Sequence, residues 1–138
     1  MSEIYRFGIS LEKQLINSFD RLIKEKNYTN RSEAIRDLIR QELVKKEWEK
    51  NNNIAGAITL IYDHHREGLT NSLLDIQHNF RKLIISSQHI HIDCDNCLEI
   101  IAIKGESKEA LELANMIKSL KGIKHVTLSM SSTGEHID

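Results

Sequence analysis

The chain of 138 residues contains no proline, only two cysteines and no apolar run long enough to cross a membrane. A spanning helix needs about 20 mostly apolar residues, and the N-terminus shows no signal-peptide pattern. We therefore expect a cytoplasmic protein without a membrane partner. Two cysteines in a reducing compartment favour metal binding or free thiols over a disulfide. The absence of a nucleophile–base pair and of a phosphate-binding glycine loop argues against an enzyme.

Charge is divided unevenly between the two halves of the chain. Residues 1–50 contain 11 Lys and Arg against 9 Asp and Glu, a net charge of +2, whereas residues 51–138 contain 8 against 11, a net charge of −3. A weakly basic first half is compatible with nucleic-acid binding but does not demonstrate it.

The first 50 residues predict a strand followed by two helices. Residues 4–11 alternate between apolar and polar side chains, which predicts a short half-buried strand. Residues 12–26 have helical apolar spacing, and Asn30 precedes a second apolar stripe as an N-cap with Glu33 three residues later. A β-α-α unit of this size cannot bury enough surface alone, and its single strand leaves both backbone edges unpaired. We expect it to pair with a second copy.

Residues 6–11 and 28–37, Arg-Phe-Gly-Ile-Ser-Leu and Tyr-Thr-Asn-Arg-Ser-Glu-Ala-Ile-Arg-Asp, resemble ribbon-helix-helix DNA-binding domains. The resemblance implies that two chains pair their strands and insert the ribbon into the major groove of double-stranded operator DNA. It also implies two groups of contacts: base edges for Arg6 and Ser10, and phosphate for Asn30, Arg31 and Ser32 at the helix N-terminus. Gly8, in the central outward position, has no side chain with which to read a base.

The remaining residues predict a second α+β domain. Residues 47–53 form a polar run typical of a linker. Beyond them the pattern predicts strands at 54–62, 86–93, 97–104 and 123–130, helices at 67–84 and 107–121, and a frayed tail at 131–138. This β-α-β-β-α-β order predicts a ferredoxin-like sheet with both helices on one face. We therefore divide the chain into domains 1–50 and 51–138, and expect a second chain to cover the open face.

Two histidines and two cysteines lie close together in residues 88–99. On a strand, His89 and His91 point to the same face, and a nearby thiolate would complete a nitrogen and sulfur ligand set. The same residues can also be surface histidines and small buried apolar side chains. A further alternative is a tetrahedral zinc site within one chain, formed by both histidines with Cys94 and Cys97.

The second domain resembles the nickel-responsive regulator family, NikR, in residues 75–78, His89-x-His91 and Cys97-Leu98-Glu99. That resemblance implies an ACT-like regulatory domain and a nickel-dependent repressor of transcription. It also implies a homotetramer, a dimer of dimers, that holds one Ni²⁺ per chain. The implied ligands are His89, His91 and Cys97 of one chain and His78 of a neighbouring chain. Three imidazoles and a thiolate suit square-planar Ni²⁺, whereas Zn²⁺ favours a tetrahedron.

The same resemblance implies three further roles. His64 belongs to a secondary, weaker metal site, Arg66 contacts the DNA backbone, and Glu33 with Asp37 binds K⁺ between the domains. Alternatives to nickel regulation are a constitutive DNA-binding protein, an amino-acid-sensing repressor and a metal storage protein. The first two leave the clustered His and Cys residues unexplained, and the third needs no DNA-reading ribbon.

Overall fold

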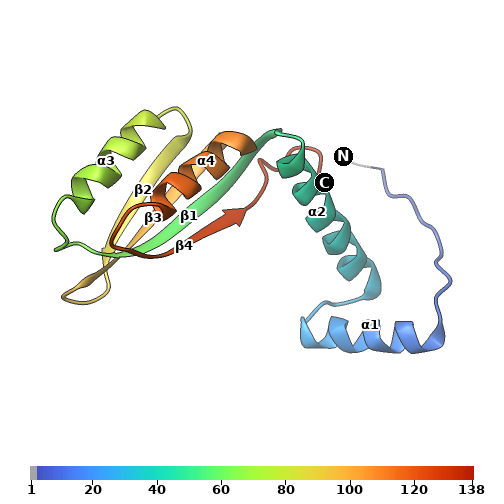
Figure 1. The fold of residues 1–138 in the computed structure, drawn as a ribbon. Coiled ribbons are helices and arrows are strands. Elements are labelled where there is room, and N and C mark those ends of the chain that lie inside the picture. Colours follow the sequence, from blue (N-terminus) through green and yellow to red (C-terminus); the bar gives the residue numbers. More distant parts are fainter. Residues whose placement is uncertain (1–2) are drawn as a thin grey trace. The chain divides into compact units, whose positions relative to one another are not determined.

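The computed structural model describes residues 3–138, and the chain divides into two compact units. Unit 1 contains the chain up to Leu43 together with His136–Asp138, and unit 2 contains Val44–Glu135. The division therefore falls earlier than the boundary expected after residue 50. Helix α1, Lys13–Glu25, lies in unit 1, and helix α2, Arg31–Glu49, starts in unit 1 and ends in unit 2 (Figure 1).

The start of α2 is capped as the sequence predicts. Asn30 accepts a hydrogen bond from the backbone N–H of Glu33 through its Oδ1 atom at 2.9 Å, which satisfies one of the free amides of the first turn. The Glu33 carboxylate in turn accepts from the backbone N–H of Thr29 at 3.0 Å. This reciprocal pair fixes where the second helix begins.

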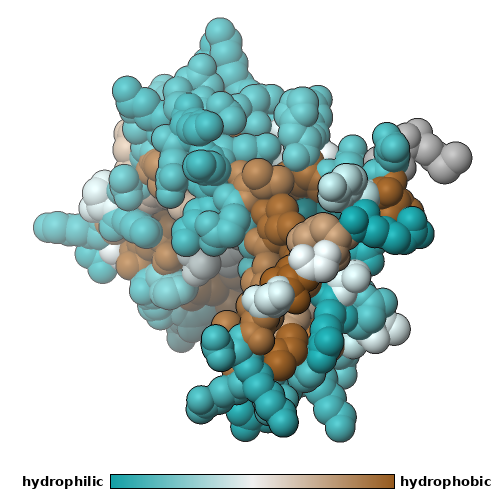
Figure 2. All heavy atoms as spheres, turned by 90° about the vertical axis from the view of Figure 1, so that its right-hand side faces the viewer, coloured by the Kyte–Doolittle hydropathy of each residue, from teal (hydrophilic) through white to brown (hydrophobic). Residues whose placement is uncertain are grey.

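The strand expected at residues 4–11 is not formed in the single chain. Residues 3–12 have no regular secondary structure, and Tyr5 and Phe7 are 86% and 67% exposed. The reason is physical, because a lone strand has no backbone partner on either edge. These side chains and apolar residues of both helices line a hollow of about 720 Å³ in unit 1. Apolar side chains also form a band on the side of the molecule shown in Figure 2.

The polar run at residues 47–53 is not a linker. Helix α2 continues to Glu49, and Trp48 is only 5% exposed in the core of unit 2. Its indole N–H donates to the Ser131 carbonyl at 2.8 Å, and Ser107 Oγ donates to the Trp48 carbonyl at 2.7 Å. The expected frayed tail is also wrong at its start, because the Ser131 N–H donates to Ala55. The buried Trp48 indole thus holds residues near the end of α2 and the start of the C-terminal tail against the core of unit 2.

Unit 2 has the expected ferredoxin-like order. The fully antiparallel sheet runs β2-β3-β1-β4, and α3 and α4 lie on one face of it (Figure 1). The strands are β1 Asn53–Asp63, β2 Ile84–His91, β3 Asn96–Glu106 and β4 Ile123–Met130, and the helices are α3 Leu69–Asn79 and α4 Ser107–Lys118. The α+β fold class is confirmed. No helix in residues 3–138 is long and apolar enough to span a membrane.

Helix α3 is shorter than the sequence pattern predicts. It ends at Asn79 rather than Ile84, because the chain turns after Phe80 and Leu83 enters the core. The Leu83 carbonyl accepts from the Lys104 N–H at 2.9 Å, which starts the pairing of β2 with β3. The apolar residues 83 and 84 therefore serve the sheet and not the helix.

Replacing Trp48 tests its place in the core of unit 2. We expect Trp48→Ala to lower the free energy of unfolding by about 3–5 kcal/mol, because it leaves a cavity and a free Ser131 carbonyl. Urea unfolding followed by far-UV circular dichroism measures this change. Exposed Lys45 on the same helix is the control, and Lys45→Ala should change stability by less than about 0.5 kcal/mol. Equal effects of both substitutions would restore the linker interpretation.

Candidate metal centre

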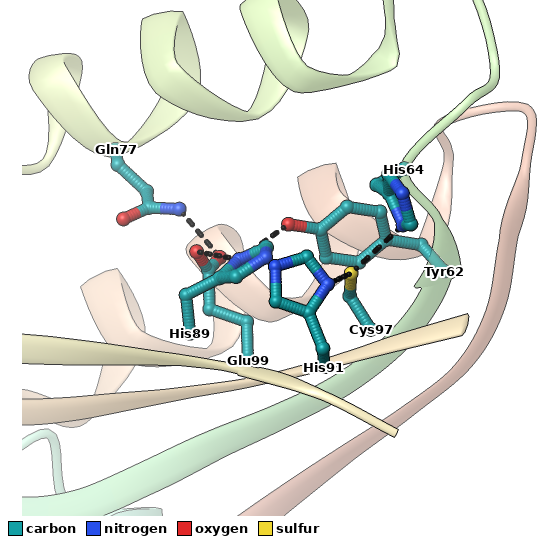
Figure 3. Close-up of polar contacts among 7 residues, drawn as sticks. All are labelled: Tyr62, His64, Gln77, His89, His91, Cys97 and Glu99. Atoms are coloured by element: carbon teal, nitrogen blue, oxygen red, sulfur yellow. Dashed lines mark hydrogen bonds and ion pairs between the residues drawn. The ribbon is translucent and has the colours of Figure 1, made fainter. Parts of the chain in front are cut away.

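Strand register brings the metal-binding candidates to one face of the sheet. His91 pairs with Cys97 and His89 pairs with Glu99 across β2 and β3, and Tyr62 of β1 pairs with Cys97 from the other side. Directly opposed residues of antiparallel strands share a face. These side chains therefore point to the face that α3 and α4 cover (Figure 3). The two histidine rings lie side by side as predicted, with centroids 5.1 Å apart.

A cluster of one sulfur and two nitrogen ligands forms within a single chain. Cys97 Sγ lies 3.1 Å from His64 Nδ1 and 3.5 Å from His91 Nδ1 (Figure 3). His64 follows the last residue of β1, which carries its ring over the cysteine. The ligand atoms of these three residues all lie within 4.8 Å of one another, so one ion could contact all three. We call this group the Cys97 cluster.

His89 stands beside the Cys97 cluster and has other partners. Its Nδ1 lies 3.1 Å from the Tyr62 hydroxyl and 3.9 Å from Glu99 Oε1. Glu99 Oε2 accepts a 2.8 Å hydrogen bond from Gln77 Nε2 of α3. His89 is thus held by groups from β1, β3 and α3, while its ring remains partly exposed.

Burial controls protonation in this region. Burial, and then the charges of Asp63, Asp93 and Glu99, raise the pKa of the Cys97 thiol. Burial also raises the pKa of Glu99, against the hydrogen bond from Gln77 and the charge of His89. The Cys97 thiol therefore keeps its proton at neutral pH until a cation replaces it. Metal binding must release this proton, so acid should weaken it.

Cys94 does not join the Cys97 cluster. It is exposed on the turn between β2 and β3, and its carbonyl lies 2.9 Å from His65 Nε2. In residues 3–138, two groups have a geometry that could hold an ion: the Cys97 cluster, and Asp63 with His64 and His65. The structure thus assembles no ligand set from Cys94 and Cys97 together.

The other expected metal ligands lie apart from the Cys97 cluster. His78 is exposed in the last turn of α3. Glu33 accepts from Thr29, whose hydroxyl and N–H lower the pKa of the Glu33 carboxyl. Asp37 accepts from the Tyr28 hydroxyl and, at 3.1 Å, from Gln41 Nε2. The two carboxylates expected to bind K⁺ therefore each have hydrogen-bond partners within unit 1.

The residues expected to contact DNA are mostly exposed. Arg6, Ser10 and Ser32 are exposed, and Asn30 caps α2. Arg31 forms a bidentate pair with Asp20, at 2.9 and 2.8 Å. Arg66 packs so closely over Gly122 that a Cβ atom there would lie 2.3 Å from Arg66 Cδ.

Three residues of the site carried no sequence prediction of their own: Tyr62, Gln77 and Glu99. A signal for Glu99 exists, because it occupies an inward position on β3 between buried Cys97 and buried Ile101. A carboxylate at such a position needs a polar partner. Tyr62 likewise ends the inward-facing row of β1, but nothing in the sequence pairs it with His89.

The donor atoms suit a borderline or soft transition metal. Imidazole nitrogen with thiolate sulfur is a set that Ni²⁺, Cu²⁺ and Zn²⁺ all accept, whereas Mg²⁺ and Ca²⁺ prefer oxygen. Cys97, His91 and His89 lie on adjoining strands with little backbone freedom, so the residues present fit such an ion. Two groups in residues 3–138 have a geometry that could hold an ion, and Asp63 is the only residue in them with an oxygen ligand.

Comparison with known proteins gives matches over both units. Residues 55–131 match the family described as NikR C terminal nickel binding domain, and residues 5–46 match ribbon-helix-helix protein, copG family. The chain is 58% identical over 135 residues to the "Putative nickel-responsive regulator" of Syntrophus aciditrophicus, with 98% of each chain covered. It is 57% identical over 132 residues to the protein of that name from Chlorobium phaeobacteroides, with 96% of this chain and 98% of the other covered.

A solved structure has a similar fold over part of the chain. An uncharacterized protein from Thermotoga maritima matches with a TM-score of 0.51 and 14% identity, over 56% of this chain and 95% of the other. At this identity the similarity shows the fold alone.

Alkylation should distinguish the two cysteines in the metal-free protein. We expect iodoacetamide at neutral pH to modify exposed Cys94 well before Cys97, because Cys97 is buried and its pKa is raised. Peptide mapping by mass spectrometry follows both thiols in the same sample, so Cys94 serves as the internal control. Equal rates, or faster modification of Cys97, would contradict the burial of the cluster.

Proposed function

The chain belongs to the NikR family of nickel-responsive transcriptional regulators, which are not enzymes, and we propose that it is a repressor that binds operator DNA when Ni²⁺ fills sites between its subunits. The observation that carries this proposal is the β2–β3 register, which sets His89 and His91 beside Cys97 on one face. The match of residues 5–46 to ribbon-helix-helix proteins supports the DNA-binding half of the proposal.

The proposed nickel ligands are His89, His91 and Cys97 of one chain and His78 of a neighbouring chain, with one Ni²⁺ per chain. His78 is exposed and does not join the Cys97 cluster of its own chain. Leu74, one helical turn earlier on the same side of α3, is 59% exposed. An exposed leucine beside an exposed histidine suits a surface that packs against another subunit. We propose a homotetramer on this basis.

His64 is proposed as a ligand of a secondary, weaker site. Its ring contacts Cys97 Sγ at 3.1 Å and also lies near Asp63 and His65. Asp63, His64 and His65 form a second group that could hold an ion, and we assign the secondary site to it. For Glu33 and Asp37 we propose K⁺ binding, since carboxylates are suitable hard ligands and the lowered pKa keeps Glu33 ionised.

DNA binding is proposed for a ribbon made of residues 4–11 from two chains. The apolar side chains of this segment are exposed, and a second copy would give its backbone a partner and cover those side chains. A two-stranded ribbon fits the major groove. Arg6 and Ser10 would then face base edges.

The N-terminus of α2 is proposed to meet DNA phosphate. Asn30, Arg31 and Ser32 lie there, where free backbone amides and the helix dipole favour an anion. Asp20 holds the Arg31 guanidinium through two atoms and leaves its remaining donors for phosphate. Arg66 in unit 2 is proposed as a further contact to the DNA backbone.

Nickel would act by linking chains. His89, His91 and Cys97 of one chain and His78 of another would hold one ion, and the bonds between chains that it would supply would favour the arrangement of subunits in which both ribbons reach DNA. Because an effector shifts an equilibrium only through its differential affinity, operator DNA should tighten nickel binding by the same factor by which nickel tightens DNA binding.

Substitution of the ligands tests the proposal. Nickel should strengthen operator binding of the unaltered chain by about 5–150-fold, the usual range for allosteric coupling. His89→Ala and Cys97→Ser should abolish this gain, as measured by fluorescence anisotropy of labelled operator with and without Ni²⁺. Cys94→Ser is the matched control and should keep both the gain and the nickel–thiolate absorption. Loss of that absorption in Cys94→Ser but not in Cys97→Ser would contradict the proposal, because the nickel-bound thiolate would then be Cys94 and not Cys97.

A further inference from the structure

A short turn joins the two strands that carry His91 and Cys97. Strand β2 ends at His91 and β3 begins at Asn96, so residues 92–95 lie between these two candidate ligands. Cys97 Sγ lies 3.5 Å from His91 Nδ1 (Figure 3). This contact depends on the turn, because strand pairing continues from the turn and a shift of one residue would point every following side chain to the other face.

The Asp93 side chain folds this turn. Its Oδ1 atom accepts hydrogen bonds from the backbone N–H groups of Asp95, at 2.9 Å, and Asn96, at 2.7 Å. The Asn96 side-chain amide donates to the two carboxylate oxygens, at 3.2 and 3.1 Å. An aspartate that accepts from the backbone two residues later stabilises a turn. The Asp93 carboxylate therefore spans the turn as far as the first residue of β3.

Contacts from two other parts of unit 2 reach the folded turn. Asp93 holds the nitrogen of the Asn96 amide, and the oxygen of the same amide accepts from the Lys124 ammonium of β4. His65 Nε2, in the loop after β1, lies 2.9 Å from the Cys94 carbonyl. The Cys94 side chain stays exposed on the turn. The turn thus has one defined position relative to β4 and to the loop after β1.

We propose that Asp93 is a positioning residue of the nickel site, which keeps the turn between β2 and β3 folded in the metal-free protein so that His91 and Cys97 already face each other when the ion arrives. This inference rests on the proposed function, in which these two residues bind the ion. Asp93 belongs to neither group that could hold an ion in residues 3–138, so it acts through the turn. A loop that is ordered beforehand does not have to lose conformational entropy on binding.

Four variants of the full chain separate the geometry of the turn from its charge. Asp93→Ala removes the carboxylate, Asp93→Glu keeps the charge but moves it outward by one methylene, and Asp93→Asn keeps the Oδ1 acceptor without the charge. Asp95→Ala is the matched control, because Asp95 has the same charge in the same turn, is exposed and, within residues 3–138, makes no side-chain hydrogen bond.

Two measurements follow these variants. Competition with a chelator of known affinity gives the affinity for Ni²⁺. Hydrogen exchange of the Ile92 N–H in the metal-free protein reports whether the turn is folded, since this N–H donates to the Asn96 carbonyl and not to the Asp93 side chain. Far-UV circular dichroism shows whether each variant keeps its fold.

We expect Asp93→Ala to weaken nickel binding about tenfold, the loss produced when the binding-competent form is populated only about one-tenth of the time. Its Ile92 N–H should exchange faster, with an unaltered circular dichroism spectrum. Asp93→Glu should show the same two changes. Asp93→Asn should restore both the affinity and the slow exchange, and Asp95→Ala should match the unaltered chain.

Two results would overturn the inference. One is unaltered nickel affinity in both Asp93→Ala and Asp93→Glu, and the other is an equal loss of affinity in Asp93→Ala and Asp95→Ala, which would assign the effect to charge. Cys97→Ser separates this failure from failure of the proposed function. Full nickel affinity in Cys97→Ser would remove the proposed ligand set, whereas weak binding in Cys97→Ser with full affinity in Asp93→Ala would remove only the role of Asp93.

Discussion

The antiparallel pairing of β3 with both of its neighbours is the constraint on which the site depends. It sets His91 and Tyr62 opposite Cys97 and His89 opposite Glu99. Because side chains alternate along a strand, a shift of one residue in either register would turn the cysteine away from the histidines. The apolar inward rows of β1 and β3, covered by the two helices, fix this register. The metal chemistry is thus a consequence of core packing.

Both units have features that a single chain does not satisfy. In unit 1 the segment before α1 has no backbone partner and exposes its aromatic side chains. In unit 2 the ligand candidate His78 stands in solvent, away from the Cys97 cluster. A second copy would resolve both, through a paired ribbon in one unit and a shared ion in the other. Under the proposed function, this need for a second copy would allow an ion to act as a signal.

The sequence predicts the order of elements well because apolar periodicity reflects burial directly. The four strands and two helices of unit 2, and the Asn30 cap, follow from local pattern. The strand predicted at 4–11 does not form in a single chain, because a strand needs a backbone partner and local sequence does not show whether one is present. The linker predicted at 47–53 was wrong because the Trp48 indole is buried in the core and hydrogen-bonded to Ser131, although its neighbours in the sequence are polar. The contact of His64 with Cys97 joins two strand ends 33 residues apart, which no local pattern reveals.

The central claim is that each nickel site is completed by two chains, and a mixture of two defective chains tests it most directly. His78→Ala chains keep Cys97, and Cys97→Ser chains keep His78. The measurement is nickel–thiolate absorption of each variant alone and of the two unfolded and refolded together. The account predicts weak nickel binding by either variant alone and recovery of tight, thiolate-bound nickel in the mixture. Tight binding by His78→Ala alone, or no recovery on mixing, would contradict it.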